Sequence, residues 1–264
     1  MILLAQNTAT LFPEPMPAQH RLFHVSDIHF GVEHKDALQW FVEAVRVEMP
    51  DAVVCTGDLT QRATHRQFAQ ARTFFAGLDV PVVLEPGNHD MPYYNLWERF
   101  TQPYKRYGAL AAAVGQSLEL EHLVTIPLKT TVRAQPRFPW SDGYVRAEAL
   151  AETVNLLNML NDDPRHKIVT AHHPLLPANA NGKNPTIGGD NAFAALADAG
   201  ADAILTGHVH VPFDMQRASG NRSIRMIGAG TLSTRLRGAE PGYNYITFSR
   251  TAGLTVEQRI FGAG

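Results

Sequence analysis

Apolar and polar positions along the chain predict short buried strands that alternate with amphipathic helices. Apolar runs bounded by turn residues or polar blocks predict strands at residues 22–25, 53–56, 81–84, 119–126, 166–171 and 203–206. Apolar side chains at helical spacing predict helices at residues 36–49, around 68–75, and at 92–107, 147–160 and 191–199. In the third of these helices, Pro92 is expected in the first turn, where a proline costs no hydrogen bond.

The C-terminal part has the pattern of β-hairpins, with turns expected at Gly220-Asn221 and Ala252-Gly253. Residues 1–20 contain three prolines and no clear period, so we expect an N-terminal tail. No linker rich in glycine, serine or charge divides residues 21–264, which are expected to form one domain. Alternating strands and helices followed by hairpins predict an α/β fold, with mixed sheets covered by helices.

Composition narrows the class of protein. With 264 residues, 45% of them hydrophobic, the chain can build a sizeable core. A formal net charge of −2 gives no charge-based reason to expect nucleic acid or a membrane as a partner. Cys55 is the single cysteine and lies in a predicted strand, so no intramolecular disulfide is possible. With no signal-peptide pattern and no long apolar stretch, we expect a cytoplasmic protein.

Five polar blocks each follow a predicted strand directly. They are Asp27-Ile28-His29, Gly57-Asp58, Gly87-Asn88-His89-Asp90, His172-His173-Pro174 and Gly207-His208-Val209-His210. Sites in open α/β sheets form beyond the carboxyl ends of strands, so the five blocks are expected to meet at one edge. Side chains two positions apart on an extended chain point the same way, which would let Asp27 and His29 share an ion. Gly57 and Gly87 are expected where the chain turns sharply.

The donor types in these blocks indicate a metal site. Three oxygen donors accompany four imidazoles, a set that suits Mn, Fe or Zn better than calcium. Seven ligands are too many for one tetrahedral ion, but they divide between two ions if one carboxylate bridges them. The ligand set is Asp27, His29, Asp58, Asn88, His172, His208 and His210.

Each block has an ordinary structural explanation when taken alone. Gly-Asp is a common turn, Asp-x-His is frequent by chance, and a histidine pair before proline fits a structured loop. Only the five blocks together, in this order and each after a strand, favour the metal site. His24 lies within a strand and is expected to be a buried, hydrogen-bonded histidine with no ligand role.

Together these blocks resemble the calcineurin-like metallophosphoesterase superfamily over about residues 21–261. The resemblance implies a four-layer α-β-β-α sandwich of two mixed sheets flanked by helices. It implies one ion held by Asp27, His29, Asp58 and His210, and a second held by Asp58, Asn88, His172 and His208. Asp58 would bridge the two ions. His89 would contact the phosphate and protonate the leaving oxygen, with Asp90 orienting it, and His173 would support the ligands from behind.

Within that superfamily, the blocks look like those of bacterial class III cyclic-nucleotide phosphodiesterases and related glycerophosphodiesterases. The implied reaction is hydrolysis of a small phosphodiester by a metal-bridging hydroxide. Gln61-Arg62 and residues 129–142 depart from the pattern of that group, which leaves the substrate open. The alternatives are a phosphomonoesterase, a nucleotide or lipid-precursor hydrolase, and, more remotely, a non-catalytic interaction module on the same fold.

Specificity is expected to come from loops around the site. Arg133, Arg137 and Arg235 are candidates for binding the substrate together with Asn88 and His89, although each arginine could instead be a solvated loop residue. Tyr93 and Tyr94 could line the pocket or pack on a helix face.

Overall fold

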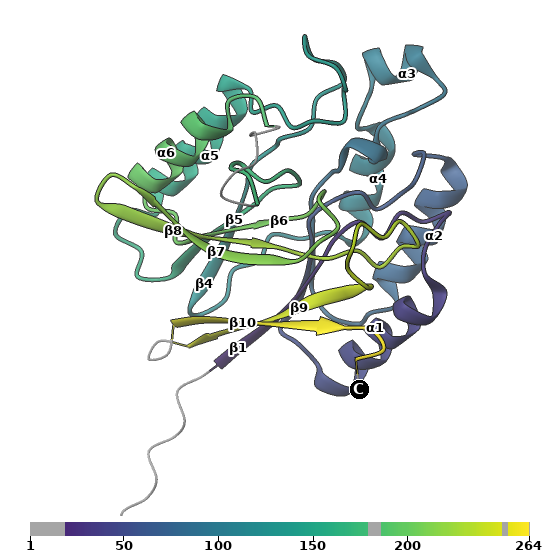
Figure 1. Cartoon of the computed structure of the whole chain (residues 1–264), viewed down its shortest axis with the longest axis horizontal. Helices are drawn as coiled ribbons and strands as arrows, with labels where there is room; N and C mark the ends of the chain where they lie inside the picture. Colours follow the sequence, from purple (N-terminus) through teal and green to yellow (C-terminus); the bar gives the residue numbers. More distant parts are fainter. Residues whose placement is uncertain (1–18, 179–185, 250–252, 264) are drawn as a thin grey trace, which may run out of the picture.

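Two five-stranded sheets form the centre of the molecule in this computed structural model, which describes residues 19–178, 186–249 and 253–263 (Figure 1). The first sheet has the order β10-β9-β1-β2-β3, from β1 (Gln19–Val25), β2 (Ala52–Cys55), β3 (Val82–Leu84), β9 (Gly242–Ser249) and β10 (Gly253–Ile260). The second has the order β4-β5-β6-β8-β7, from β4 (Leu123–Pro127), β5 (His166–Thr170), β6 (Ala203–Thr206), β7 (Phe213–Ser219) and β8 (Arg222–Gly228).

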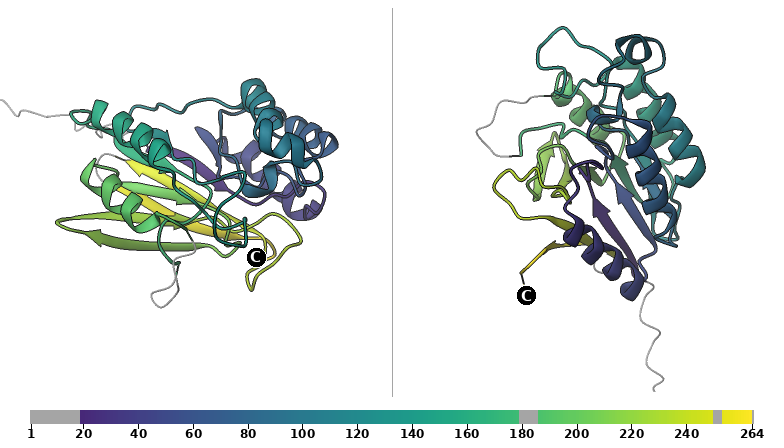
Figure 2. Two further views of the ribbon diagram at one scale, coloured as in Figure 1. Left: turned by 90° about the horizontal axis from the view of Figure 1, so that it is seen from above. Right: turned by 90° about the vertical axis from the view of Figure 1, so that its right-hand side faces the viewer.

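Helices cover the outer face of each sheet, as the two views in Figure 2 show. The first sheet is covered by α1 (Lys35–Glu48), α2 (His65–Ala76) and α4 (Lys105–Val114), and the second by α5 (Ala147–Met159) and α6 (Gly189–Asp198). A third group of buried side chains, including Val54, Leu205 and Phe248, fills the space between the sheets. The four-layer α-β-β-α sandwich is therefore confirmed.

Side chains point alternately to the two faces of β1, so this strand contributes to two groups of buried residues. Phe23 and Val25 pack towards the helices, while Leu22 packs between the sheets. His24 is fully buried and lies within hydrogen-bonding distance of Thr56 and Asn244, which confirms the expected role of that histidine. Strands β1, β2 and β3 run parallel, as do β4, β5, β6 and β8. Their carboxyl ends therefore reach a common edge of the sandwich.

The single helix expected at residues 92–107 is wrong. The structure has α3 (Leu96–Thr101) followed by α4, with Gln102 between them at φ −141° and ψ 56°. Pro103 explains the break, because a proline disfavours helical geometry in the residue before it. The Asn95 side chain accepts a hydrogen bond from the Glu98 N–H and caps α3. The helix therefore begins at Leu96, four residues after the predicted start at Pro92.

Two expectations fall partly outside the described residues. Of the expected tail, residues 1–20, only Gln19 and His20 are described, and both belong to β1. Strands β9 and β10 pair antiparallel as expected, although Ala252 of the predicted turn lies outside the described residues. In the part of the chain that the structure describes, no helix is long and apolar enough to cross a membrane.

Glu85 joins the two sheets from a buried position that sequence reasoning did not single out. It follows β3, is 5% exposed, and accepts a hydrogen bond of 2.5 Å from the Thr170 hydroxyl at the end of β5. Burial raises the pKa of Glu85 to about 8, against the hydrogen bond and the charge of His172, which lower it. The folded protein therefore holds a proton on Glu85 at neutral pH.

Replacing Glu85 with glutamine is expected to stabilise the protein in a pH-dependent way. The unfolded chain releases this proton near pH 4.5, so the free energy of unfolding falls as the pH rises from 4.5 towards 8. Glutamine keeps the shape and stays neutral. Urea unfolding at saturating metal should show Glu85→Gln gaining roughly 2–4 kcal/mol at pH 8 and little at pH 4.5. An equal gain at both pH values would contradict a neutral Glu85.

Candidate metal centre

The five polar blocks meet at the carboxyl edge of the two sheets. Asp27 and His29 follow β1, and Asp58 follows β2. Asn88 follows β3 and begins the short 3₁₀ helix η1 (Asn88–Asp90). From the second sheet, His172 follows β5, and β6 leads into His208 and His210. Side-chain atoms in several three-residue sets of these groups lie within 4.8 Å of one another. The expected convergence of the seven candidate ligands is what the structure shows.

The backbone at these positions is left-handed where an extended chain was expected. Asp27, His29 and Asp58 have φ of 54°, 50° and 52°, and His208 and His210 have φ of 69° and 63°. Left-handed backbone is unfavourable for residues other than glycine and tends to gather at functional sites. Tertiary hydrogen bonds hold it here, for example from the His29 N–H to the Asp58 carbonyl at 2.9 Å. Extended backbone is therefore not what brings Asp27 and His29 together, although their ligand-type atoms do lie within 4.8 Å of each other.

The two glycines of the central blocks serve different purposes. Gly57 has φ +98°, so it does supply the sharp turn that was expected. Gly87 has an ordinary φ of −93°. A Cβ at Gly87 would lie 2.0 Å from the Asp58 backbone nitrogen and 2.1 Å from its Oδ1. Gly87 is therefore required because two backbone segments approach closely beneath the site.

One group of ligand atoms consists of acceptors that face each other. His210 Nδ1 donates to the Arg235 carbonyl at 2.6 Å, which leaves Nε2 of neutral His210 with a lone pair. That Nε2 lies 3.1 Å from Asp27 Oδ1 and 3.2 Å from His29 Nε2. Among the described residues, Asp27 Oδ1 and His29 Nδ1 are buried with no hydrogen-bond partner. A bound cation would satisfy these converging acceptors, so the residues present fit a metal ion.

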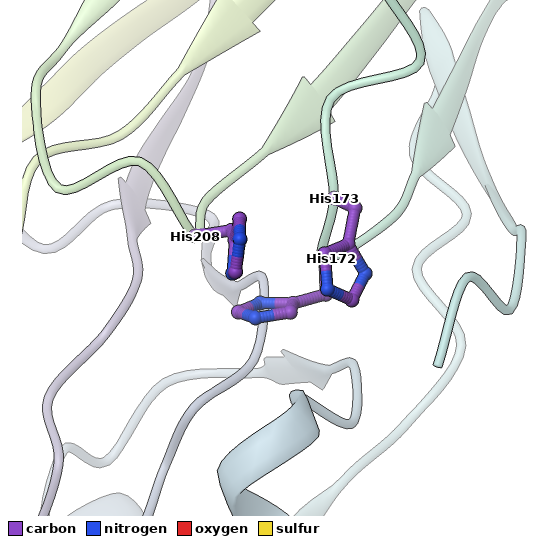
Figure 3. A group of neighbouring side chains, drawn as sticks. All are labelled: His172, His173 and His208. Atoms are coloured by element: carbon purple, nitrogen blue, oxygen red, sulfur yellow. The ribbon is translucent and has the colours of Figure 1, made fainter. Parts of the chain in front are cut away.

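A second group of ligand-type atoms converges around His172. His172 Nδ1 donates to the Thr56 carbonyl at 2.7 Å, and its Nε2 lies 3.2 Å from Asn88 Oδ1 and 3.4 Å from Asp58 Oδ1. The His208 ring lies nearly perpendicular to that of His172, with 5.2 Å between centroids (Figure 3). The other oxygen of Asp58, Oδ2, lies 3.6 Å from His29 Nε2. The two oxygens of Asp58 therefore face the two groups of ligand atoms.

Electrostatics within the site favours the metal-binding forms of Asp27, Asp58 and His208 and opposes that of His172. Although burial opposes it, the nearby His210 and His29 rings hold the pKa of Asp27 well below its usual value. Asp58 also has a lowered pKa, because the charges of nearby histidines outweigh its burial. Burial, reinforced by His172, lowers the pKa of His208 to about 3. Despite its burial, His172 has a pKa raised to about 9 by Asp58, so an ion there must displace a proton.

His173 lies beside these ligands, but both of its ring nitrogens are occupied by the protein. Nε2 lies 2.9 Å from the Ser141 carbonyl, and Nδ1 lies 2.9 Å from the Thr130 hydroxyl. The same hydroxyl accepts from the His173 N–H, so its own proton points to Nδ1. His173 is thereby fixed with its proton on Nε2. This arrangement agrees with the supporting role that was expected for it.

His89 stands at the rim of the site and is held by a residue that sequence reasoning missed. Its Nδ1 donates to the Gln61 carbonyl at 2.8 Å, and its Nε2 lies 3.1 Å from Arg235 Nη1. Since a guanidinium only donates, Nε2 carries the lone pair. Burial lowers the pKa of His89 against the opposing charge of Asp58. The ring is therefore neutral, with Nε2 directed towards Arg235.

Asp90 has a different role from the expected one. Its carboxylate accepts from the Gly87, Leu59 and Thr60 N–H groups, at 2.9, 3.1 and 2.8 Å, and from the Thr60 hydroxyl at 2.9 Å. Asp90 therefore ties the loop after β3 to the loop after β2. The carbonyl of Gln61, and not Asp90, orients His89. The reason is that η1 turns the Asp90 side chain back towards the Asp58–Thr60 backbone.

The three candidate arginines lie in different surroundings. Arg235 Nη1 approaches His89, and lies 3.3 Å from His29 Nε2, so the structure brings Arg235 to the site. Arg133 donates to the Phe100 carbonyl at 2.7 Å, and Arg137 lies 3.4 Å from Asp142. A substrate contact by Arg133 or Arg137 stays a prediction.

Two hydroxyl residues that sequence reasoning missed hold Asp27 and His173 in place. The Thr231 hydroxyl, in the segment after β8, donates to the Asp27 carbonyl at 2.6 Å. Thr130 holds His173 from the segment after β4. Both segments also follow parallel strands, and that position is the one signal that could have pointed to them.

The fold and the converging acceptor groups define a class of metal-dependent hydrolases. The sequence profile of calcineurin-like phosphoesterases matches residues 20–212. The chain belongs to the calcineurin-like phosphoesterase family, and it is a metal-dependent phosphoric ester hydrolase.

Curated relatives are similar at modest identity. A probable cyclic nucleotide phosphodiesterase of a Pseudoalteromonas species is 27% identical, covering 75% of this chain and 74% of the relative. The 3',5'-cyclic adenosine monophosphate phosphodiesterase CpdA of Pseudomonas aeruginosa is 28% identical, covering 84% and 75%. A UDP-2,3-diacylglucosamine pyrophosphatase, LpxG of Chlamydia muridarum, is 24% identical, covering 73% and 64%.

Solved structures share the fold. A dimetal phosphatase from Danio rerio superposes with a TM-score of 0.62 at 14% identity, covering 92% of this chain and 96% of its own. The purple acid phosphatase PPD1 of yellow lupin gives a TM-score of 0.64 at 13% identity, covering 93% and 52%. At these identities the likeness concerns the fold alone.

Proposed function

We propose that this chain is a dinuclear-metal-dependent phosphodiesterase that hydrolyses a small diester. The observation that carries the proposal is the placement of Asp58. One of its carboxylate oxygens faces His29, and the other faces His172. A carboxylate in that position can bridge two ions, and paired ions are used for in-line displacement at phosphorus. The two phosphodiesterases among the relatives support a diester over a monoester.

The proposed ligands divide between the two ions according to their neighbours. Asp27, His29 and His210 would hold one ion together with Asp58, and Asn88, His172 and His208 would hold the other together with Asp58. Mn, Fe and Zn all suit this mixture of imidazole and oxygen donors. When bound, such ions lower the pKa of coordinated water and offset charge on phosphate oxygens.

The chain's own residues then position the ester and its leaving group. Arg235 Nη1 and His89 Nε2 point towards each other beside the ligands, where an anionic phosphate oxygen would pair with the guanidinium. Because His89 keeps its Nδ1 proton on the Gln61 carbonyl, it can protonate a leaving oxygen only after taking up a second proton at Nε2. A phosphate anion next to Nε2 would favour that uptake.

We also propose a cytoplasmic location. The support is the single cysteine, Cys55, which is fully buried in β2 and has a pKa raised well above its usual value by burial. A buried thiol of this kind requires no oxidising compartment.

A panel of phosphate esters on the metal-loaded protein tests the proposed function. We expect kcat/KM for bis-p-nitrophenyl phosphate to exceed that for p-nitrophenyl phosphate by at least about tenfold, or about 1.4 kcal/mol. The reverse ratio would favour a phosphomonoesterase. The similarity to LpxG gives a specific reason to include a UDP-sugar pyrophosphate, and activity confined to that compound would favour a lipid-precursor pyrophosphatase.

His89→Ala provides a matched variant for the same panel. Loss of a proton donor should lower kcat by roughly 10²-fold. The loss should be larger for esters with poor alkyl leaving groups than for p-nitrophenyl esters, since p-nitrophenolate departs without a proton. A uniform loss across leaving groups would assign His89 to phosphate binding alone.

A further inference from the structure

The exposed aromatic side chains of this protein gather in one place. Among the phenylalanine, tyrosine and tryptophan residues that the structure describes, the exposed ones all lie around α3 or in the loop between β4 and α5. Figure 1 shows α3 at one end of the molecule, beyond α4, and the teal loop before α5 reaches the same end. We call this group the aromatic surface, and it consists of Tyr93, Tyr94, Trp97, Phe100, Phe138 and Trp140.

Contacts between the two segments show that the aromatic surface is continuous. The Tyr93 and Tyr94 rings meet edge-on, with 5.2 Å between centroids, and the Phe100 and Trp140 rings do so at 6.2 Å. Phe138 and Trp140 of the loop also line one cavity together with Tyr93. Contiguous exposed apolar patches of this kind mark interaction sites, whereas single exposed apolar residues are ordinary.

Helix α3 turns its charged side inwards and its aromatic side outwards. Arg99 is only 8% exposed, because its guanidinium donates to the carbonyls of Arg133 and Pro92 at 2.9 and 3.3 Å. Trp97 is 79% exposed, and Phe100, three positions later, lies next to it on the helix surface. A helix that packs on its own core has the opposite orientation. The outer face of α3 is therefore arranged for a partner outside the chain.

Basic residues accompany the aromatic surface. Residues 91–107 and 128–146, which carry it, contain seven lysines and arginines and two carboxylates, a formal charge of +5 in a chain of net charge −2. Both carboxylates are paired within these segments, Glu98 with Arg106 and Asp142 with Arg137. The charge of the whole chain conceals this local excess, which favours a negatively charged partner.

Two of the basic residues flank α3 at different places. Lys105 lines a cavity together with Asn95 and Glu98, at the beginning of α3. Lys129 lines another cavity together with Pro103, just after the end of α3. Both lysines are exposed, and none of the salt bridges within the described ranges involves either of them. Their charges are therefore available to a partner that covers the aromatic surface.

We propose that the aromatic surface docks on an anionic lipid bilayer. The tryptophan and tyrosine rings would lie at the level of the lipid headgroups, where such amphipathic rings gather. Lysines and arginines beside them would lie against anionic headgroups. The cytoplasmic leaflet carries the negative surface potential that this requires, which agrees with the proposed location. The inference goes beyond the proposed reaction and does not depend on it.

A bilayer fits this surface better than a second copy of the chain or an acidic protein does. A two-fold interface would place the same basic segments against each other, and their like charges would repel. An acidic protein would satisfy the lysines and arginines but offers no apolar layer to the exposed rings. A bilayer offers an apolar interior directly beneath charged headgroups, and Trp97 and Trp140, two of the three tryptophans, suit that boundary.

The first test is co-flotation of the metal-loaded protein with vesicles. Vesicles of phosphatidylcholine with about 30% phosphatidylserine should bind at least about tenfold more protein than vesicles of phosphatidylcholine alone. Trp97→Ala should lower the binding by at least about fivefold. Met159→Ala, at the end of α5, is the matched control, because Met159 is 81% exposed and lies outside the aromatic surface. Alanine at either exposed position leaves the fold intact, so the two variants can be compared directly.

The second test removes the charge. The double variant Lys105→Glu with Lys129→Glu should lower binding to the anionic vesicles by at least about tenfold. Arg222→Glu is its control, because Arg222 is an exposed residue of β8, in neither basic segment, and its replacement should change nothing. Brominated lipids should quench the tryptophan fluorescence of the bound protein, and Trp97→Ala should reduce that quenching. Unchanged quenching in Trp97→Ala would contradict insertion of α3.

Several outcomes would overturn the bilayer proposal. These are equal binding to neutral and anionic vesicles, and equal binding by Trp97→Ala and Met159→Ala. Self-association that Trp97→Ala removes, without vesicle binding, would assign the aromatic surface to a second copy. Binding of polyglutamate as tight as that of anionic vesicles would assign it to an acidic protein. Because flotation measures no hydrolysis, the bilayer proposal and the phosphodiesterase proposal can each fail alone.

Discussion

Replacing Asp58 with asparagine is expected to lower kcat by at least about 10³-fold, a loss of about 4 kcal/mol in transition-state stabilisation. Asparagine preserves the shape and can still accept the His89 N–H, which lies 2.8 Å from Oδ1. It removes the negative charge that the proposed bridge needs between the two groups of ligand atoms. Metal analysis by mass spectrometry should show the content falling from two ions per chain to one or fewer.

Asp79→Asn is the matched control for this change. Asp79 has a left-handed backbone like Asp58, with φ 56° against 52°, but lies in an exposed turn after α2. Its replacement should change neither metal content nor activity, which separates the loss of charge at the site from any general effect of asparagine in left-handed backbone. Two tightly bound ions and near-normal kcat in Asp58→Asn would rule out Asp58 as the bridge.

Replacing Gly87 with alanine is expected to destabilise the fold by at least about 3 kcal/mol and to weaken metal binding. The new methyl group would lie 2.0 Å from the Asp58 backbone nitrogen and 2.7 Å from its Cα. A side-chain rotation cannot relieve a clash with backbone, so the loops after β2 and β3 must separate. Urea unfolding of metal-free protein measures the structural part, and metal titration measures the loss at the site.

Gly108→Ala serves as the comparison. Gly108 lies in α4, and a Cβ there would meet nothing within 4 Å. Alanine is the better helix former, so this change should be neutral or stabilising by up to about 1 kcal/mol. If Gly87→Ala were as well tolerated as Gly108→Ala, the close approach of the two loops would not be required by the fold.

Much of the site could be predicted because its signals are local in the sequence. Each block directly follows an apolar run, and the carboxyl ends of parallel strands share one edge, so Asp27, Asp58 and His172 had to come near one another. The fold class followed from the same alternation of strands and helices. The division of residues 92–107 into two helices was also encoded locally, by Pro103, and was missed because apolar spacing was given more weight than the residue before the proline.

Other features depended on contacts between segments far apart in the chain. Asp90 follows His89 directly, yet it binds the backbone of Leu59 and Thr60, while Gln61 orients His89 from 28 residues away. Three arginines looked equivalent in the sequence, and tertiary packing brought Arg235 to the ligands while Arg133 and Arg137 found partners elsewhere.

The sequence by itself determined which donors are available and at which edge of the sheets they gather. Tertiary structure decided how they are oriented: it holds five of these residues in left-handed backbone, sets the tautomers of His173 and His210, and brings Arg235 to His89. The physical reason is that donor type and strand order are local or topological properties. The direction of a side chain and the position of its proton depend instead on partners that only the folded chain brings within hydrogen-bonding distance.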